Sequence, residues 1–539
     1  MSGRKLVTLG YILAFWGLLP GMLAALAAWG ERVFGPGLRL PDLRPAALLL
    51  AGLSGVMLAL SIVQYTRASG SLPISAFPPR QLIRSGVFGV WRHPIYLFSV
   101  FFFSGLAMLF RPAGAILVVF PALAAGTLIY AGIEEGGLKR RFGSLYDGHR
   151  RQTSVLIPRL PHIVRPVAAV LSRIFFRLEV LGRENSALAP PFVVVSAHRN
   201  YLDPVFISVA LNVPVHFITT FEMFRRPASR LIFSRLLSLP KRRYRPDVRN
   251  ALDIRRRLLE GCVVGIFPEA ERSWTGTMIG FKPEVLKLLQ RHSEIPILPV
   301  RLEGTYAAWP RWARGLRRTK VRVVIEKPVF VDRRESPAEL EARLGRLIAP
   351  REAAALRPGS VSAAGIEDLI YRCPACLSFD TVQSGKGPDF WCSKCRAGFG
   401  LLADLSIQRS CSGLRTSLAD ISARIRAVAE DSPADGDAGI LRAEAGLAIE
   451  TRDQLRSAGA GRLDLSADRL SFEAGGTPVR IDLDSIRSVV IEGARKLQVY
   501  GGRPPGLFQF TLSDQSALKW QNLVADAVRS RSGFSPSTA

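Results

Sequence analysis

The sequence predicts a multidomain protein: an α-helical membrane bundle of four spans, an α/β domain, a four-cysteine metal module and a small, mainly β domain. Three observations predict this order. Long apolar segments are confined to the first 132 residues. Short apolar strands alternate with basic helical stretches between residues 190 and 305, and four of the six cysteines form two Cys-x-x-Cys pairs. The 539 residues have room for roughly three to five domains of the usual size.

The composition indicates a membrane protein with an anionic partner. Lys and Arg total 72 against 44 for Asp and Glu, a net charge of +28, yet 48% of residues are hydrophobic. Such an excess attracts phospholipid headgroups, acidic substrates or nucleic acid, although a GC-rich genome that favours arginine accounts for part of it. Because the apolar segments indicate a bilayer, we favour anionic lipid and expect no nucleic-acid partner.

Four apolar segments approach the roughly 20 residues that a helix needs to span a bilayer. They cover residues 6–29, 45–64, 94–110 and 112–132. A cleaved signal peptide is the alternative for the first segment, because Arg4 and Lys5 precede it. Its length and the three segments that follow favour a retained span.

Basic residues orient these segments, because cytoplasmic loops are enriched in Lys and Arg. We therefore expect a multi-pass protein of a bacterial inner membrane, with both termini and the region after the fourth segment in the cytoplasm. The three clusters that we place in the cytoplasm are Arg4 and Lys5; Arg67, Arg80, Arg84 and Arg92; and Lys139, Arg140, Arg141, Arg150 and Arg151.

Ionisable residues flank the predicted hairpin of the third and fourth segments. Arg92, His93 and Tyr96 lie at its entry, and Glu134 and Glu135 lie at its exit. Ionisable side chains at a membrane boundary are energetically unfavourable, so their presence there indicates a function. Together they could hold a small cationic cofactor that carries an amine; charges that snorkel to the interface around a turn proline are the alternative.

Several short motifs around this hairpin occur in a familiar order over residues 40–160. The stretch resembles the isoprenylcysteine carboxyl methyltransferase and phospholipid N-methyltransferase families. The resemblance implies S-adenosylmethionine bound between Arg92, His93, Tyr96, Glu134 and Glu135. Leu97 and His149 depart from the pattern, which leaves the methyl acceptor open. The matching motifs are Gly86-x-Phe88, Arg92-His93-Pro94-x-Tyr96, Glu134-Glu135-x-x-Leu138, Phe142-Gly143-x-x-Tyr146 and Ile157-Pro158.

Residues 165–178 alternate basic and apolar groups at helical spacing. This pattern is typical of a helix that lies in the membrane interface. An amphipathic helix packed on a protein core fits the pattern equally well.

A histidine and an aspartate follow the next apolar strand, residues 192–195. His198 and Asp203 are five residues apart, so both can lie where a loop enters a helix. An aspartate can orient a histidine so that the histidine takes a proton from a hydroxyl, but such a pair alone is weak evidence for catalysis.

Three further sequence blocks follow the pair. They are a basic run at 239–245, a strand with charged residues at its end at 263–273, and a strand with a turn at 295–306. Strands that alternate with helical stretches predict an α/β sheet.

Taken together, the four blocks resemble the glycerolphosphate and 1-acylglycerol-3-phosphate acyltransferase family over residues 175–330. His198 and Asp203 match its His-x4-Asp motif. Arg243 matches the arginine of its second block, Glu269 and Arg272 match its third, and Gly304 its fourth. The resemblance implies that His198 deprotonates an acceptor hydroxyl, which attacks an acyl thioester of coenzyme A or acyl carrier protein. Asp203 would orient His198, and Arg243, Glu269 and Arg272 would bind the substrate's phosphate and glycerol.

The third block departs from the family pattern. The usual Glu-Gly-Thr-Arg reads Glu269-Ala270-Glu271-Arg272 here. A side chain replaces a glycine, and Glu271 adds negative charge near the expected phosphate. This allows a different headgroup or a zwitterionic acceptor in place of lysophosphatidate, and a non-catalytic protein on this fold is the alternative.

The two Cys-x-x-Cys pairs have the spacing of a metal site. Cys373, Cys376, Cys392 and Cys395 form two Cys-x-x-Cys knuckles separated by fifteen residues. Four thiolates suit a structural, tetrahedral zinc ion, and a rubredoxin-like iron site is the alternative.

The last part of the sequence predicts a small β domain. Short alternating strands between residues 462 and 512 are followed by a helix at 517–528. This order resembles a pleckstrin-homology or GRAM-like domain, which would bind lipid or protein or pack on the rest of the chain.

The leading hypothesis is a membrane-bound acyltransferase that acylates a lysophospholipid-like acceptor, has membrane phospholipids and lysophospholipids as partners, and also transfers methyl groups from S-adenosylmethionine. The alternatives are a membrane methyltransferase alone, of lipid or isoprenylcysteine type, and a non-catalytic membrane scaffold. The predicted boundaries are 1–162 for the methyltransferase-like domain, 163–348 for the acyltransferase domain, 349–365 for a linker, 366–402 for the zinc ribbon and 440–532 for the β domain.

Overall fold

The computed structural model forms two compact units, residues 1–163 with 259–262, and residues 164–258 with 263–539. Each unit is described by itself. Arg4, Lys5, Arg80 and the start of the first apolar segment lie outside the described residues. The structure describes residues 10, 13–38, 40–70, 73, 81–211, 213–351, 356, 359–431, 441–451, 453–475 and 478–533.

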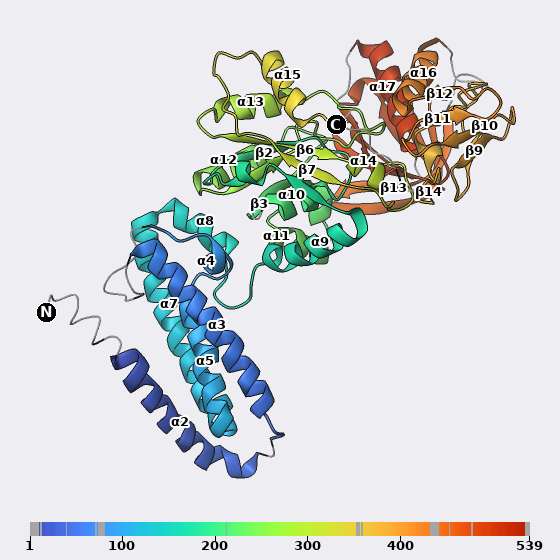
Figure 1. The fold of residues 1–539 in the computed structure, drawn as a ribbon. Coiled ribbons are helices and arrows are strands. Elements are labelled where there is room, and N and C mark those ends of the chain that lie inside the picture. Colours follow the sequence, from blue (N-terminus) through green and yellow to red (C-terminus); the bar gives the residue numbers. More distant parts are fainter. Residues whose placement is uncertain are drawn as a thin grey trace. The chain divides into compact units, whose positions relative to one another are not determined.

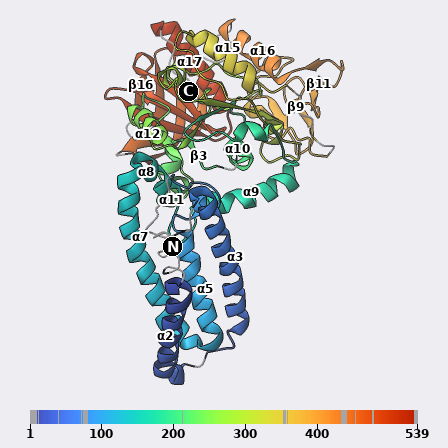
Figure 2. The same cartoon turned by 60° about the vertical axis from the view of Figure 1, so that its left-hand side comes forward.

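The first unit is a bundle of long helices (Figures 1 and 2). Helices α3 and α5 pack along much of their length, and two short helices, α4 and α8, lie at one end of the bundle. The helices are α2 (Leu19–Phe34, after a π-helical turn at Ala14–Leu18), α3 (Arg44–Ser69), α4 (Gly86–Val90), α5 (Pro94–Phe110), α6 (Pro112–Gly114, continuous through Ala115–Val119 with α7), α7 (Phe120–Phe142) and α8 (Ser144–Gln152).

Apolar helices occupy the described part of each of the four predicted segments. Among the described residues, two of them, Arg44–Ser69 and Pro112–Phe142, are long and apolar enough to cross a membrane, and Pro94–Phe110 is a shorter apolar helix. Their outward side chains are apolar; Leu49 and Ile129, for example, are more than half exposed. This surface favours association with a membrane.

The hairpin between α5 and α6 packs closely against α2. The backbone amide of Gly114 donates to Glu31 Oε2 at 3.0 Å, which satisfies a free amide of the first helical turn. A Cβ atom at Gly114 would lie 2.0 Å from the carbonyl oxygen of Ala27. The close approach of these helices therefore requires glycine at this position.

The second unit begins with a seven-stranded sheet in the order β1-β7-β6-β2-β5-β3-β4. Strands β2 to β6 run parallel to one another, whereas β7 is antiparallel to β6. The strands are β1 (Glu179–Leu181), β2 (Val193–Ser196), β3 (Val215–Thr220), β4 (Leu239–Lys241), β5 (Val263–Ile266), β6 (Ile297–Glu303) and β7 (Arg322–Ile325).

Helices cover both faces of this sheet, so its central strands are buried on both sides. Val193 and Val195 pack with α12, α13 and α15, whereas Val194 packs with α9 and α10 on the opposite face. This alternation explains the continuous apolar run of β2. The helices are α9 (Leu160–Phe176), α10 (Asp203–Leu211), α11 (Pro227–Arg235), α12 (Val248–Leu259), α13 (Pro283–Arg291), α14 (Thr305–Ala308) and α15 (Pro337–Ile348).

The cysteine pairs lie beside a five-stranded antiparallel sheet in the order β12-β11-β10-β9-β8. This sheet continues past residue 402, where the sequence predicted the module to end. Its strands are β8 (Val382–Ser384), β9 (Asp389–Cys392), β10 (Gly398–Leu401), β11 (Ile407–Arg409) and β12 (Arg415–Thr416), and helix α16 (Leu418–Asp431) follows.

The C-terminal β domain is a seven-stranded antiparallel sheet in the order β16-β15-β14-β13-β19-β18-β17, packed against α17. The sequence indicated most of these strands but missed β13 and the start of β14. Both segments are rich in alanine and glycine, which are poor strand formers. The elements are β13 (Leu441–Thr451), β14 (Gln454–Leu465), β15 (Arg469–Glu473), β16 (Val479–Asp482), β17 (Ser488–Glu492), β18 (Lys496–Gly501), β19 (Gly506–Leu512) and α17 (Ala517–Ser532).

Candidate functional site

Three sequence blocks meet at one edge of the α/β sheet. His198 follows β2, Glu269 follows β5 and Thr305 follows β6, and these strands are parallel neighbours. The carboxyl ends of adjacent parallel strands are the usual place for a ligand in such sheets. The fold thus brings together residues that are up to 107 positions apart in the sequence.

His198 and Asp203 form a hydrogen-bonded pair at this edge. His198 Nδ1 lies 2.9 Å from Asp203 Oδ2, which also accepts the backbone N–H groups of Arg199 at 2.6 Å and Asn200 at 2.8 Å. The Asp203 side chain is fully buried, whereas that of His198 keeps 21% of its surface exposed. Asp203 therefore fixes the ring while the ring's other nitrogen stays available for a proton.

The environment of His198 keeps its imidazole neutral. Burial lowers the pKa of His198, and the charges of Arg272 and Arg311 lower it further, while the hydrogen bond and charge of Asp203 oppose them. The Phe267 ring stacks on the imidazole with centroids 4.2 Å apart. A neutral, oriented imidazole can act as a general base at neutral pH.

Glu269 is fully buried behind the pair. Its Oε1 accepts the backbone N–H of His198 at 3.3 Å, and its Oε2 accepts that of Ile279 at 3.1 Å. Burial raises the pKa of Glu269 to about 7, against the effect of these hydrogen bonds and of the Arg199 charge. The carboxyl group therefore ties the loop after β2 to the loop after β5.

Arg272 lies near His198 with unused hydrogen-bonding capacity. Its guanidinium stacks 3.5 Å above the centre of the Tyr201 ring, and burial lowers its pKa to about 10, so it stays cationic at neutral pH. Its buried Nη1 has no hydrogen-bond partner among the described residues. A free, buried donor of this kind suits an anionic group of a substrate.

Arg243 has a different environment. Its Nη2 donates to the carbonyl oxygen of Ile491 in the C-terminal β domain at 3.1 Å, while its buried Nε has no hydrogen-bond partner among the described residues. Neighbouring side chains of the basic run also reach this domain: Arg242 lies 2.6 Å from Asp453, and the Tyr244 hydroxyl lies 2.9 Å from Glu450. Most of the run therefore contacts protein rather than an open site.

Gly304, of the fourth block, has a structural reason to be glycine. It adopts a φ of +78°, and a Cβ atom there would lie 2.0 Å from the carbonyl oxygen of Lys320. The turn after β6 can form only without a side chain at this position.

The five residues predicted at the membrane hairpin also come together, within the first unit. Arg92 Nη1 lies 3.2 Å from Glu135 Oε1, and His93 Nδ1 lies 3.2 Å from Glu134 Oε2. The Tyr96 ring stacks on His93 with centroids 5.7 Å apart. Glu135 contacts two permanent cations, Arg92 and Arg150, whereas the ion pair of Glu134 among the described residues is with His93, so Glu134 is the carboxylate that could accept a further positive charge.

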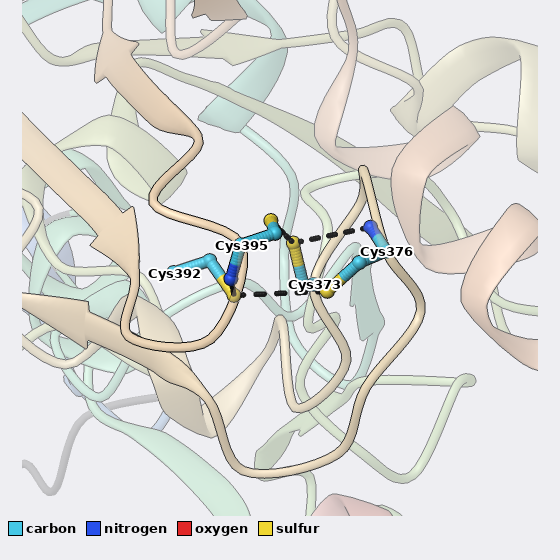
Figure 3. Close-up of side chains that lie close together, drawn as sticks. All are labelled: Cys373, Cys376, Cys392 and Cys395. Carbon is cyan, nitrogen blue, oxygen red and sulfur yellow. Dashed lines mark hydrogen bonds between the residues drawn. The ribbon is translucent and has the colours of Figure 1, made fainter.

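The four paired cysteines converge from two loops (Figure 3). Their sulfur atoms all lie within 4.8 Å of one another. In two of the pairs, Cys373 with Cys395 and Cys376 with Cys392, the sulfur atoms are 3.7 Å apart. Thiolates about 2.3 Å from a tetrahedral zinc ion would be about 3.8 Å apart. The four cysteines could therefore bind zinc.

Several residues of these sites could not be predicted from sequence patterns. Phe267 and Tyr201 flank His198 and Arg272, but an aromatic residue inside a motif is a weak signal by itself. Arg150 Nε lies 3.5 Å from Glu135. Arg311 contacts the loop that carries Arg272 from 39 positions away, and no local pattern indicates this.

Comparison with known protein families gives two matches. The acyltransferase family matches residues 177–303, and the phospholipid methyltransferase family matches residues 44–144. No curated protein matches the chain.

Solved structures include two that resemble parts of the chain. The 1-acyl-sn-glycerophosphate (LPA) acyltransferase PlsC from Thermotoga maritima is 24% identical, over 35% of this chain and 78% of that chain, with a TM-score of 0.30. The N-terminal PH domain of human ARAP2 is 15% identical, over 20% of this chain and 95% of that domain, with a TM-score of 0.17.

The two family matches cover the two clusters of polar side chains. His198, Asp203, Glu269 and Arg272 lie inside the first match, and the five residues of the membrane hairpin lie inside the second. The chain thus combines a domain of the acyltransferase family with an N-terminal domain of the phospholipid methyltransferase family.

Proposed function

We propose that the protein is a membrane-bound O-acyltransferase that transfers a fatty acyl group from a thioester of coenzyme A or acyl carrier protein to a hydroxyl of a lysophospholipid, such as a 1-acylglycerol-3-phosphate-like acceptor. The observation that carries this proposal is the 2.9 Å contact between His198 Nδ1 and Asp203 Oδ2 at the carboxyl end of β2. The match of this region to the acyltransferase family supports it.

In the proposed reaction, His198 acts as the general base. With its Nδ1–H donated to Asp203, its Nε2 accepts the proton of the acceptor hydroxyl, whose oxygen forms a bond to the thioester carbonyl carbon. The C–S bond then breaks, and the leaving thiolate takes the proton from His198. Asp203 stabilises the transient imidazolium. Atoms and charges balance without any further reactant.

We assign acceptor binding to Arg243, Glu269 and Arg272. Arg272 is the best placed to contact a phosphate, because its Nη1 is buried and unused. Glu269 would contribute by holding the backbone of His198, since both of its oxygens accept backbone hydrogen bonds. Arg243 retains one free donor beside its bond to Ile491.

A panel of acceptors tests this proposal. Protein in detergent micelles would be given labelled acyl-coenzyme A or acyl-acyl carrier protein and, in turn, lysolipids that differ in headgroup. We expect a labelled diacyl product from at least one of them. If no lysolipid accepts the acyl group from either donor, the proposal is wrong.

A second activity is favoured by the cluster at the membrane hairpin. We propose that Arg92, His93, Tyr96, Glu134 and Glu135 bind S-adenosylmethionine, which supplies a methyl group when bound. Glu134, which has no arginine partner in the ion pairs of the described residues, suits its amino or sulfonium charge, and the buried hydroxyl of Tyr146 has no hydrogen-bond partner among the described residues. Incubation with labelled S-adenosylmethionine should label lipid in wild-type membranes. Unlabelled lipid and protein would contradict this activity.

We propose four membrane spans, with both termini and the acyltransferase domain in the cytoplasm of a bacterium. The two long apolar helices and the basic residues around them support this topology. Helix α9 would lie in the membrane interface, because its apolar side chains Val167, Val170, Leu171 and Ile174 are all more than half exposed.

The remaining modules have supporting roles in this proposal. Zinc would be structural, since four thiolates leave no open coordination position. The C-terminal β domain would be pleckstrin-homology-like, as its antiparallel sheet and closing helix suggest. We retain the predicted domain boundaries of 1–162, 163–348 and 440–532, and we extend the predicted module 366–402 to include strands β11 and β12.

A further inference from the structure

We propose that Arg311 is a positioning residue for acyl transfer, through which the C-terminal β domain holds the Arg272 loop in its working conformation. This loop comprises residues 268–274. The inference rests on the proposed acyltransferase function. It adds to that function a residue outside the four sequence blocks and a role for a domain far along the chain.

Arg311 uses its whole guanidinium to join the loop to the β domain. Its Nη1 donates to the Glu271 carboxylate and to the carbonyl oxygen of Arg272, the latter at 3.3 Å. Its Nη2 donates to the carbonyl oxygen of Ile491 at 2.9 Å, and its Nε donates to that of Gly493 at 3.3 Å. The side chain is 1% exposed. A planar, five-donor group is suited to such a bridge, and a lysine could not make it.

The loop needs such a restraint because its backbone is strained. Ala270 adopts a φ of +56°, in the left-handed region that favours glycine. The family pattern has glycine at this position. A residue with a Cβ atom keeps this conformation only where its surroundings hold it there. The contacts of Arg311 with the two residues that follow Ala270 supply this restraint.

The conformation of the loop bears directly on the site. The backbone N–H of Ser273 donates to the carbonyl oxygen of His198 at 3.2 Å, and Glu269 accepts the N–H of His198. The same loop carries Arg272. Relaxation of the loop would therefore displace both the proposed anion-binding group and the general base.

The contacts of Arg311 also explain how Glu271 is tolerated. The sequence pattern predicted that Glu271 adds negative charge near the expected phosphate. Its carboxylate is paired with Arg311. The ion pair neutralises this charge, so Glu271 need not repel an anionic acceptor. The two departures from the family pattern therefore act together: Ala270 strains the loop backbone, and Glu271 contributes the ion pair with Arg311 that holds the loop.

Four variants of the full-length protein test this inference: Arg311→Met, Ala270→Gly, the two combined, and Arg225→Met as a matched control. The side chain of Arg225 is also only 8% exposed and bonds to the β domain, at Glu450 and Asp453, but none of its hydrogen bonds or ion pairs among the described residues reaches the Arg272 loop. We expect Arg311→Met to lower kcat/KM for the acceptor about 10²-fold, because small misplacements at a reacting centre have effects of this size. KM for the acyl donor should change little.

Rescue separates positioning from folding. Adding Ala270→Gly to Arg311→Met should raise kcat/KM about tenfold above that of Arg311→Met alone, because glycine adopts the loop conformation without a restraint. It should also raise the melting temperature more in the Arg311→Met background than in wild type. Arg225→Met should retain acyl transfer within about twofold of wild type, while its melting temperature reports any loss of the domain contact.

The outcomes are distinguishable. If wild type transfers acyl groups and Arg311→Met does so at an equal rate, the inference is wrong and the proposed function stands. The inference is also wrong if Arg225→Met loses as much activity as Arg311→Met, or if Ala270→Gly rescues neither activity nor stability. If wild type transfers no acyl group at all, it is the proposed function that fails.

Discussion

At the scale of single residues, the candidate base is a local feature of the chain. His198 and Asp203 are five positions apart in one loop, so the sequence alone could predict that they meet. The sequence could not predict the buried surroundings that hold the imidazole neutral, because Phe267, Arg272 and Arg311 come from other segments. Two predictions follow from these surroundings.

The first concerns the pH dependence of acyl transfer. Burial lowers the pKa of His198, and Asp203 raises it, so the wild-type rate should rise with a midpoint below pH 6.5 and be level at neutral pH. Asp203→Asn removes the opposing influence, so the midpoint should move to lower pH still. The maximal rate should fall about 10²- to 10⁴-fold as the ring loses its tautomer. Rate measurements from pH 4.5 to 8 would contradict this if the variant's midpoint moved upward.

The second concerns Glu269 and stability. Its pKa rises from an ordinary 4.5 to about 7 on folding, so its contribution to stability is fully present below pH 4.5 and is lost as the pH rises through 7. The loss amounts to as much as about 3 kcal/mol, at roughly 1.4 kcal/mol per pKa unit. Glu269→Gln removes this titration. The melting temperature should therefore fall less between pH 5 and pH 8 in the variant; an equal fall in both proteins would show that Glu269 does not titrate there.

At the scale of elements, a strand or helix could be predicted where a continuous stretch of the sequence carries its pattern, but its contacts with distant segments could not. The strand runs before His198 and Glu269 were evident because β-branched residues buried on both faces form continuous apolar segments. Arg243 of the basic run at 239–245 stays a predicted phosphate ligand, but it and its neighbours Arg242 and Tyr244 contact Ile491, Asp453 and Glu450, more than 200 positions away. A run of charges does not reveal a partner so distant in the sequence.

The cysteine knuckles share a feature that the spacing did not predict. The residue after each pair, Leu377 and Arg396, adopts a positive φ of 62° and 58°. Arg396 is exposed, so replacing it removes little packing. Arg396→Gly should therefore stabilise the protein by up to about 1 kcal/mol.

Thermal unfolding with bound zinc would measure this effect. Arg415→Gly provides the control, since Arg415 is an exposed residue of strand β12 in the same sheet without a positive φ. The control should destabilise the protein, because glycine weakens a strand. Destabilisation by Arg396→Gly of the same size would mean that backbone strain at the knuckle is negligible.

At the scale of the whole molecule, one chain carries two clusters of polar residues in two different units. The acyltransferase and phospholipid methyltransferase families match separate stretches, 177–303 and 44–144. The predicted site residues of the membrane hairpin lie within the second stretch, and His198, Asp203, Glu269 and Arg272 lie within the first. The two proposed chemistries should therefore be separable by mutation.

Glu135→Gln tests this separation. It removes a carboxylate that contacts Arg92, Arg150 and His93, so methyl transfer from S-adenosylmethionine should fall at least about tenfold. Acyl transfer by the same preparation should stay within about twofold of wild type. Equal loss of both activities would indicate that the two sites act as one.

The most direct measurement is the rate of acyl transfer to a lysolipid by His198→Ala compared with wild type, with methyl transfer by the same preparations as the internal control. We expect acyl transfer to fall by at least about 10³-fold, since the base and its contribution to the transition state are lost, while methyl transfer is unchanged. A His198→Ala protein that retained more than about a tenth of the wild-type acyl transfer would contradict the central claim that His198 is the general base of this enzyme.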